Sequence, residues 1–278
     1  MPSPPRTIGI AGTGLIGTSI ALAARRAWPD VGLSGFDRAD VLRQPQVASV
    51  FSRLSPDLAT LAECDLIVLA LPVDAIARAV KVVASLAGAE TLITDTGSTK
   101  RAIVGAAAGV PSFVGGHPMA GAERGGPDLA RADLFDGCTW WVVPAADTAT
   151  AAVCDFARAI GASPVQVDAA RHDALMAAIS HLPQVVASAL MARVGEAAGE
   201  GGLAHAGAGL RDTTRLAASP AGMWASVLAS NADEVAPLLR AVARDLDQIA
   251  EGLHDEGAVR RLFSDANRWR APLDAERG

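Results

Sequence analysis

A glycine pattern near the N-terminus constrains the fold more than any other feature of the chain. An apolar run, residues 7–11, leads directly into Gly12-Thr13-Gly14-Leu15-Ile16-Gly17, and a helix-forming stretch follows. In this strand–turn–helix setting, Gly12 permits a tight turn, Gly14 lets a pyrophosphate approach the backbone, and Gly17 lets helix and strand pack closely. The phosphates would lie on free N–H groups at the positive end of the helix dipole. The pattern predicts a dinucleotide-binding unit, and we expect all six residues to contact the cofactor.

An acidic residue follows the second predicted strand. Residues 31–36 end at Asp37, which lies twenty positions after Gly17. A carboxylate there binds the adenosine ribose hydroxyls and repels a 2′-phosphate, so it favours NAD over NADP. Arg38 is next in the chain and partly offsets that repulsion, so NADP remains possible. We also expect Leu71 and Pro72, where a later strand ends, to contact the cofactor.

Strand and helix patterns alternate up to residue 168 and then give way to helices alone. Alternation of this kind is typical of a doubly wound sheet. We therefore predict two domains, a dinucleotide-binding domain at 1–168 and a helical domain at 169–278. In the second, residues 171–198 form a long helical stretch that Pro183 should kink, and residues 199–209 are glycine-rich and expected to be flexible. Residues 235–253 form an amphipathic stripe, suited either to an internal core or to a partner subunit.

The composition excludes several classes of protein. A net charge of -6 and a pI near 5.4 argue against nucleic-acid binding. Three scattered cysteines predict neither a disulfide framework nor a metal knuckle, and the N-terminus does not resemble a signal peptide, so we expect a cytoplasmic protein. The apolar run 8–24 is interrupted by glycines that argue against a membrane span.

A histidine between glycines is the strongest candidate for chemistry. Residues 111–114 form an apolar run that leads through Gly115-Gly116 to His117. We expect a glycine turn there to deliver the imidazole to the ligand-binding end of the sheet. Histidine can take or give a proton near neutrality, although a histidine that only caps a turn is the plainer alternative.

Several motifs occur along the chain: 12–17, 95–100 (D-x-G-S-x-K), 115–121 (G-G-H-P-M-A-G), 172–173, 180–183, and 211–215 ahead of 223–224. Together they resemble the prephenate and arogenate dehydrogenases of tyrosine biosynthesis. The resemblance covers almost the whole chain in matching order. It implies an α/β fold with an N-terminal Rossmann-like domain, followed by an all-helical C-terminal domain through which the protein forms a homodimer.

The resemblance also implies roles for individual residues. His117 is the base that draws the proton from the substrate's 4-hydroxyl as hydride leaves for NAD and the ring carboxylate leaves as carbon dioxide. Ser98 orients the imidazole or the substrate oxygen, although it could simply cap a helix. Arg215 clamps a substrate carboxylate with its guanidinium fork. His181 lies on the substrate side, or else is a buried, hydrogen-bonded imidazole. Glu123 gates the pocket mouth, unless it is a solvated turn residue.

One position departs from the family pattern. The family often reads Ser-His-Leu-Pro-His, and here the last residue is Gln184. A neutral amide offers no charge to a carboxylate, so prephenate, arogenate and the 4-amino analogue of prephenate all stay open as substrates. We favour prephenate, because no acidic residue in the matching motifs plainly awaits an ammonium group.

Other functions fit the residues less well. The β-hydroxyacid dehydrogenases share the plan of a dinucleotide domain followed by helices, but they rely on a helical lysine and the helical half contains none. Short-chain dehydrogenases use a tyrosine base, and the chain has no tyrosine. A protein that binds NAD without chemistry would not need His117 and Ser98. A metal enzyme is disfavoured because the histidines lack a compact ligand spacing.

Overall fold

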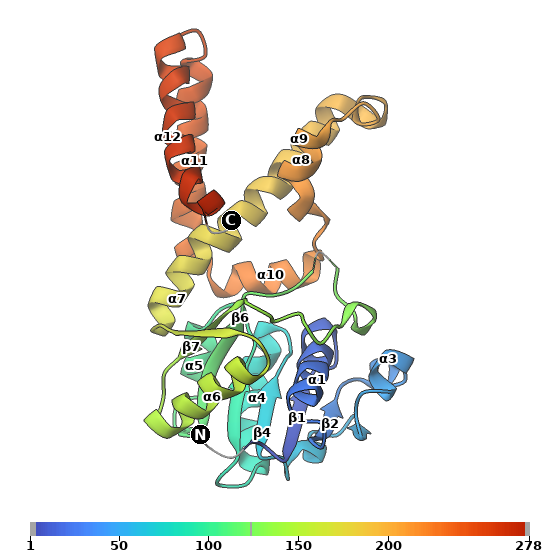
Figure 1. Ribbon diagram of the computed structural model, residues 1–278. Helices are drawn as coiled ribbons and strands as arrows, with labels where there is room; N and C mark the ends of the chain where they lie inside the picture. Colours follow the sequence, from blue (N-terminus) through green and yellow to red (C-terminus); the bar gives the residue numbers. More distant parts are fainter. Residues whose placement is uncertain (1–3, 123, 276–278) are drawn as a thin grey trace.

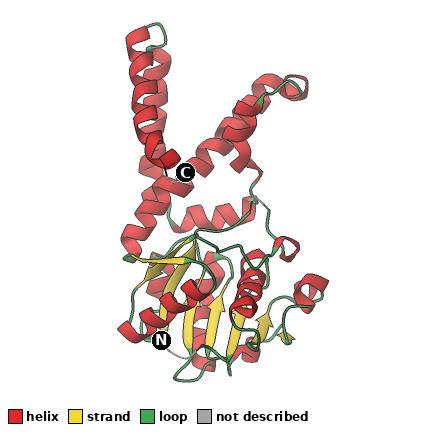
Figure 2. Ribbon diagram, in the orientation of Figure 1, coloured by secondary structure: helices red, strands yellow, loops and turns green. Residues whose placement is uncertain are grey.

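The computed structural model describes residues 4–122 and 124–275. An α/β domain forms one end of the molecule, and a helical domain lies over the ends of its strands (Figure 1). Figure 2 shows all the strands in the first domain and only helices and loops in the second. This arrangement confirms the predicted fold class.

The sheet has eight strands in the order β3-β2-β1-β4-β5-β6-β7-β8, and neighbouring strands are parallel except for the antiparallel pair β6–β7. The order reverses between β1 and β4, which is where ligands bind in doubly wound sheets. The strands are β1 (Thr7–Ala11), β2 (Gly32–Phe36), β3 (Arg53–Ser55), β4 (Leu66–Leu69), β5 (Leu92–Asp95), β6 (Phe113–Pro118), β7 (Thr139–Val143) and β8 (Ser163–Gln166).

Two apolar clusters cover the two faces of the sheet. The first contains Ile20 of α1 and Phe156 of α6, and the second contains Ile76 of α4 and Ile103 of α5. The run 8–24 therefore forms a buried strand and a core helix. The helical segments of this domain are α1 (Leu15–Ala27), α2 (Ala39–Leu42), α3 (Pro45–Ala48), η1 (Leu58–Leu61), α4 (Val73–Leu86), α5 (Arg101–Ala106), η2 (Pro127–Leu129) and α6 (Asp147–Ala159).

The helical domain contacts the sheet and also extends well beyond it. Helix α10 lies over the strand ends, while α11 and α12 project together away from the sheet and α8 and α9 lean to the other side (Figure 1). Its segments are α7 (Ala169–Met176), η3 (Ala177–His181), α8 (Leu182–Leu203), α9 (Ala208–Thr214), η4 (Arg215–Ala218), α10 (Ala221–Ser230), α11 (Ala232–Glu251) and α12 (Glu256–Ala275).

The long helix of this domain differs from the sequence-based expectation. The irregularity comes before Pro183, as a turn of π-helix at Ala177–His181, and the helix then continues through the proline as α8. The glycine-rich stretch is also helical as far as Leu203. Gly199 alone departs from helical geometry, at φ +62°.

Candidate active site

The glycine loop has the geometry that a bound pyrophosphate requires. Gly12 has φ +96°, and a Cβ there would lie 2.2 Å from the carbonyl oxygen of Ala70. A Cβ on Gly17 would lie 1.8 Å from the carbonyl oxygen of Gly12, whereas one on Gly14 would meet nothing within 4 Å. Two glycines thus permit close packing, and the third leaves open space at the start of α1. The loop fits a dinucleotide.

Asp37 is held against this loop by the protein's own donors. Its carboxylate accepts hydrogen bonds from the backbone N–H of Thr13 at 2.7 Å and from the N–H of Arg38 at 2.7 Å. The guanidinium of Arg38 is exposed and lies 3.6 Å from Asp40. Leu71 packs against the loop, its Cδ2 lying 3.2 Å from where a Cβ on Gly12 would be. Three other residues are predicted to contact the cofactor. Ile16 is partly exposed, Pro72 is exposed, and Leu15 is buried in the core.

His117 lies within a strand. The expected glycine turn before it is absent, because Gly115 and Gly116 belong to β6 and pair with Val143 and Val142 of β7. A Cβ on Gly116 would lie 2.5 Å from the carbonyl oxygen of Asp95, so glycine allows β6 to approach β5 closely. The imidazole is therefore placed by a strand and not by a turn, and it lies near the carboxyl-terminal end of β6.

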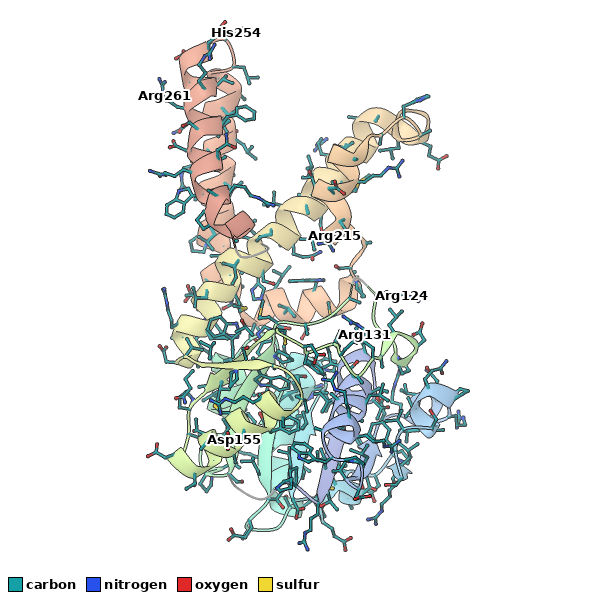
Figure 3. The ribbon with its side chains drawn as sticks, viewed as in Figure 1. Arg124, Arg131, Asp155, Arg215, His254 and Arg261 are labelled. Atoms are coloured by element: carbon teal, nitrogen blue, oxygen red, sulfur yellow. The ribbon has the colours of Figure 1, made fainter. Side chains whose placement is uncertain are left out.

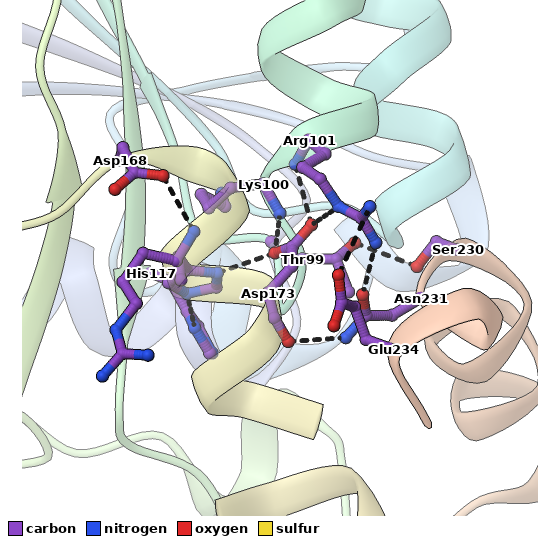
Figure 4. A network of polar contacts seen from close by, with 12 residues as sticks. Thr99, Lys100, Arg101, His117, Asp168, Asp173, Ser230, Asn231 and Glu234 are labelled. Carbon is purple, nitrogen blue, oxygen red and sulfur yellow. Dashed lines mark hydrogen bonds and ion pairs between the residues drawn. The ribbon is translucent and has the colours of Figure 1, made fainter. Parts of the chain in front are cut away.

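A second histidine and a carboxylate extend from His117 into the interior. Nδ1 of His117 lies 2.9 Å from Nε2 of His172, and Nδ1 of His172 lies 2.8 Å from Oδ1 of Asp173. His172 and Asp173 belong to α7 and are fully buried. The backbone N–H groups of Lys100 and Arg101 donate to the two oxygens of Asp173 at 2.7 and 2.9 Å (Figure 4). The chain of contacts therefore joins β6, the start of α5 and α7.

Burial sets the protonation of these groups. It lowers the pKa of His117 well below 6.5, and the nearby His172 and Lys100 add to that effect. Burial also lowers the pKa of His172, against the opposing effect of Asp173. Burial alone would raise the pKa of Asp173, but its hydrogen bonds from His172 and the two backbone N–H groups outweigh burial and lower it. The site therefore holds a neutral imidazole beside an ionised carboxylate.

A buried ion pair fixes the loop that precedes α5. The Lys100 ammonium donates to the carboxylate of Asp95 and, at 2.6 Å, to the carbonyl of Gly116. Asp95 also accepts from the N–H groups of Gly97 at 2.8 Å and Gly116 at 2.9 Å. Both charged side chains are fully buried. These bonds tie the loop that contains the partly exposed Ser98 to β6, the strand that carries His117.

On the helical side, two of the expected substrate residues bind other parts of the protein. His181 is buried, with Nδ1 3.2 Å from Nδ2 of Asn231. Gln184 is also buried, and its Nε2 donates to the carbonyl of Leu216 at 2.7 Å. Gln184 thereby holds the η4 turn that begins with the exposed Arg215, whose position between α8 and α10 is visible in Figure 3. Direct contact of these three residues with substrate remains a prediction, and Glu123 lies outside the described residues.

The comparisons with known proteins identify the family. Residues 20–166 match the nucleotide-binding domain of prephenate dehydrogenase, and residues 168–264 match its dimerization domain. The chain belongs to the prephenate dehydrogenase family. It is 31% identical to the prephenate dehydrogenase of Lactococcus lactis subsp. cremoris, over 98% of this chain and 79% of that protein. It is 32% identical to the cyclohexadienyl dehydrogenase of Zymomonas mobilis, over 97% and 96%.

A solved structure in the family has the same fold. A prephenate dehydrogenase from A. aeolicus, crystallised in complex with hydroxyphenyl propionate and NAD+, has a TM-score of 0.85 at 21% identity and covers 100% of this chain and 99% of its own. Members of the prephenate dehydrogenase family are NAD(P)-dependent oxidoreductases, and this chain is one of them.

Several residues that build this site are not apparent from the sequence alone. The His172-Asp173 pair is visible as a motif but has no evident connection to His117, and neither Lys100 nor Asp95 has a predicted role. The D-x-G-S-x-K pattern holds a signal for the latter two, because a lysine and an aspartate five positions apart bracket a tight turn. The contact between His117 and His172 spans 55 residues and has no local signal.

Proposed function

We propose that the protein is an NAD-dependent prephenate dehydrogenase of tyrosine biosynthesis, which converts prephenate to 4-hydroxyphenylpyruvate and carbon dioxide. The observation that carries the proposal is His117, a neutral imidazole at the same end of the sheet as the glycine loop. A general base must be unprotonated to act, and burial keeps His117 in that form. Asp37 and its neighbouring loop support NAD rather than NADP.

In this proposal the residues of the chain manage protons and charge. His117 takes the proton from the 4-hydroxyl, Ser98 orients the reacting groups, and Arg215 binds a carboxylate of the dianionic substrate. NAD+, when bound, accepts the hydride that leaves C4. The bond to the ring carboxylate then breaks, its electron pair makes the ring aromatic, and the C4 oxygen takes the proton back from His117. No proton is gained or lost overall.

The choice among related substrates is the finer part of the proposal. Arogenate and the 4-amino analogue of prephenate would react by the same mechanism, and the cyclohexadienyl dehydrogenase of Z. mobilis is an equally similar relative. We favour prephenate because no carboxylate in the described site stands free to bind an ammonium group. Asp95 and Asp173 are both fully buried and hydrogen-bonded within the protein.

We further propose that the protein acts as a cytoplasmic homodimer, with a dinucleotide domain at 1–168 and a helical domain at 169–278. The continuous helical stretch Ala169–Leu203 is long and apolar enough to cross a membrane by composition, and only 28% of its most apolar window is buried. A second copy packed on the helical domain would cover this surface. The match of residues 168–264 to a dimerization domain supports that assignment.

The experiment that tests the activity follows NADH absorbance with purified protein. Prephenate, arogenate and the 4-amino analogue are offered separately, each with NAD or NADP. Turnover of prephenate with NAD is the expected result. Turnover of arogenate alone would overturn the substrate assignment while keeping the mechanism, and absence of turnover with all three would overturn the proposed reaction.

A further inference from the structure

The structure places a fully buried histidine directly behind the proposed base. His172 contacts His117 through Nε2 and Asp173 through Nδ1, so it bridges the base and a carboxylate. Its ring also meets the edge of Trp141, with ring centroids 6.3 Å apart, on the strand that pairs with β6. His172 is 0% exposed, so it cannot itself reach a substrate. Any effect it has on the reaction must pass through His117.

The hydrogen bonds fix where each proton lies. Oδ1 of Asp173 faces the N–H of Lys100, and Oδ2 faces the N–H of Arg101. Because backbone N–H groups only donate, both carboxylate oxygens must accept. His172 therefore carries a proton on Nδ1 and donates it to Asp173. A neutral His172 has its lone pair on Nε2, and that nitrogen can only accept from His117.

The consequence for His117 is a single tautomer. Its Nδ1 must carry the proton that is donated to His172 across 2.9 Å, which leaves Nε2 as the unprotonated nitrogen. The opposite tautomer would bring two lone pairs together at that distance.

We propose that His172 and Asp173 are positioning residues that hold His117 in the tautomer whose Nε2 is free to take the substrate's hydroxyl proton. This inference rests on the proposed function. As His117 gains that proton, it becomes an imidazolium whose Nδ1–H still donates to His172, and Asp173 lies one ring further to stabilise the positive charge. No proton needs to move along the chain. The arrangement acts through orientation and charge, as the buried carboxylate does for a catalytic histidine in other enzymes.

The test compares two substitutions of His172, because Asp173→Asn would set an amide N–H₂ against the backbone donors that now bind the carboxylate. His172→Phe keeps a planar ring and removes the acceptor. His172→Gln offers an amide oxygen near the position of Nε2, to which His117 can still donate. Nitrogen-15 NMR of the histidines then reports which ring nitrogen is protonated, and the His117 signal is assigned by its loss in His117→Asn.

The inference predicts a proton on Nδ1 of His117 in the wild type and in His172→Gln. In His172→Phe we expect a mixture of tautomers and a kcat about 10²-fold lower than in the wild type, with unchanged NAD binding. In His172→Gln the kcat should stay within about 10-fold of the wild-type value. A wild-type proton on Nε2 would overturn the inference, and so would a His172→Phe enzyme with normal kcat and tautomer. The wild-type spectrum decides the matter even if His172→Phe does not fold. It also separates this inference from the proposed function, which fails only if the wild type turns over none of the three substrates.

Discussion

The two domains of this protein differ in how completely they bury their apolar residues. Of the buried apolar residues among those described, only five follow residue 168: Met176, Ala177, Ala187, Val227 and Val235. The exposed large apolar residues show the reverse, with four in the dinucleotide domain and nine in the helical domain. The dinucleotide domain thus completes its core within one chain, whereas the helical domain leaves apolar surface uncovered.

The buried carboxylate, ammonium and imidazole side chains among the described residues lie where the two domains meet: Asp95, Lys100, His172, Asp173 and His181. Arg101 at the start of α5 binds Asp233 of α11 through two bonds of 2.7 Å, and Asn231 donates to the carbonyl of Asp173 at 2.8 Å. The same junction holds the His117–His172–Asp173 chain. We therefore propose that the chemistry is built within one chain at this junction, while the projecting helices serve assembly.

The largest expected effect is on turnover, from His117→Asn. Loss of a general base lowers kcat by about 10²- to 10⁴-fold, and NAD binding should persist because the glycine loop is untouched. His254→Asn, at the exposed tip between α11 and α12 (Figure 3), is the matched control and should leave kcat unchanged. Steady-state kinetics and NAD titration measure both. Equal losses of kcat in the two variants would contradict the assignment of the chemistry to the domain junction and not to the projecting helices.

The two lysines of the chain provide a comparison of stability. Lys100 is fully buried against Asp95, whereas Lys81 is exposed on α4. Lys100→Met should lower the free energy of unfolding by about 3–5 kcal/mol, because it leaves the Asp95 charge buried without its partner. Lys81→Met should change it by less than about 0.5 kcal/mol. Urea denaturation measures the difference, and similar midpoints for the two variants would show that the buried pair does not stabilise the fold.

Much of the dinucleotide domain could be predicted because its signals are local. A glycine loop between strand and helix, and apolar runs such as 65–71, specify their structure within a few residues. Motifs also located His117 and Ser98 as candidates. The short strand β3 was missed, since its three residues carry too little pattern.

The parts that could not be predicted depend on contacts between distant segments. Gly115-Gly116 has the composition of a turn, but its pairing with β7 makes it a strand. Gln184 was expected to face substrate, yet whether it does so depends on the η4 turn 32 residues away, to which it is bonded. The tautomer of His117 likewise depends on residues from three separate elements.

A pH effect should follow from the buried histidines of the junction. Burial lowers the pKa of His181 from 6.5 to about 4. Below pH 6.5 the unfolded chain binds a proton that the folded chain rejects, so stability present above that pH is lost as the pH falls towards 4. The loss from His181 amounts to about 3 kcal/mol. In His181→Asn, which keeps an acceptor for Asn231, unfolding measured at pH 7 and pH 5 should show a smaller difference, whereas the exposed His205→Asn should behave as wild type.

Substitutions on the projecting helices should have the smallest effect on the fold. They also test most directly whether the uncovered apolar surface of the helical domain serves assembly. Phe263 and Trp269 on α12 are 64% and 72% exposed. If a second copy covers them, Phe263→Gln should weaken the dimer by about 2 kcal/mol, as for an aromatic side chain at the centre of an interface. The unfolding of the single chain should change by less than about 0.5 kcal/mol, since little within the chain contacts this side chain. Leu86→Gln, at an exposed apolar residue of α4, is the control and should leave the dimer intact. Sedimentation at a series of concentrations separates the outcomes: dissociation in Phe263→Gln alone supports assembly through the helical domain, whereas dissociation in Leu86→Gln alone would assign the interface to the dinucleotide domain instead.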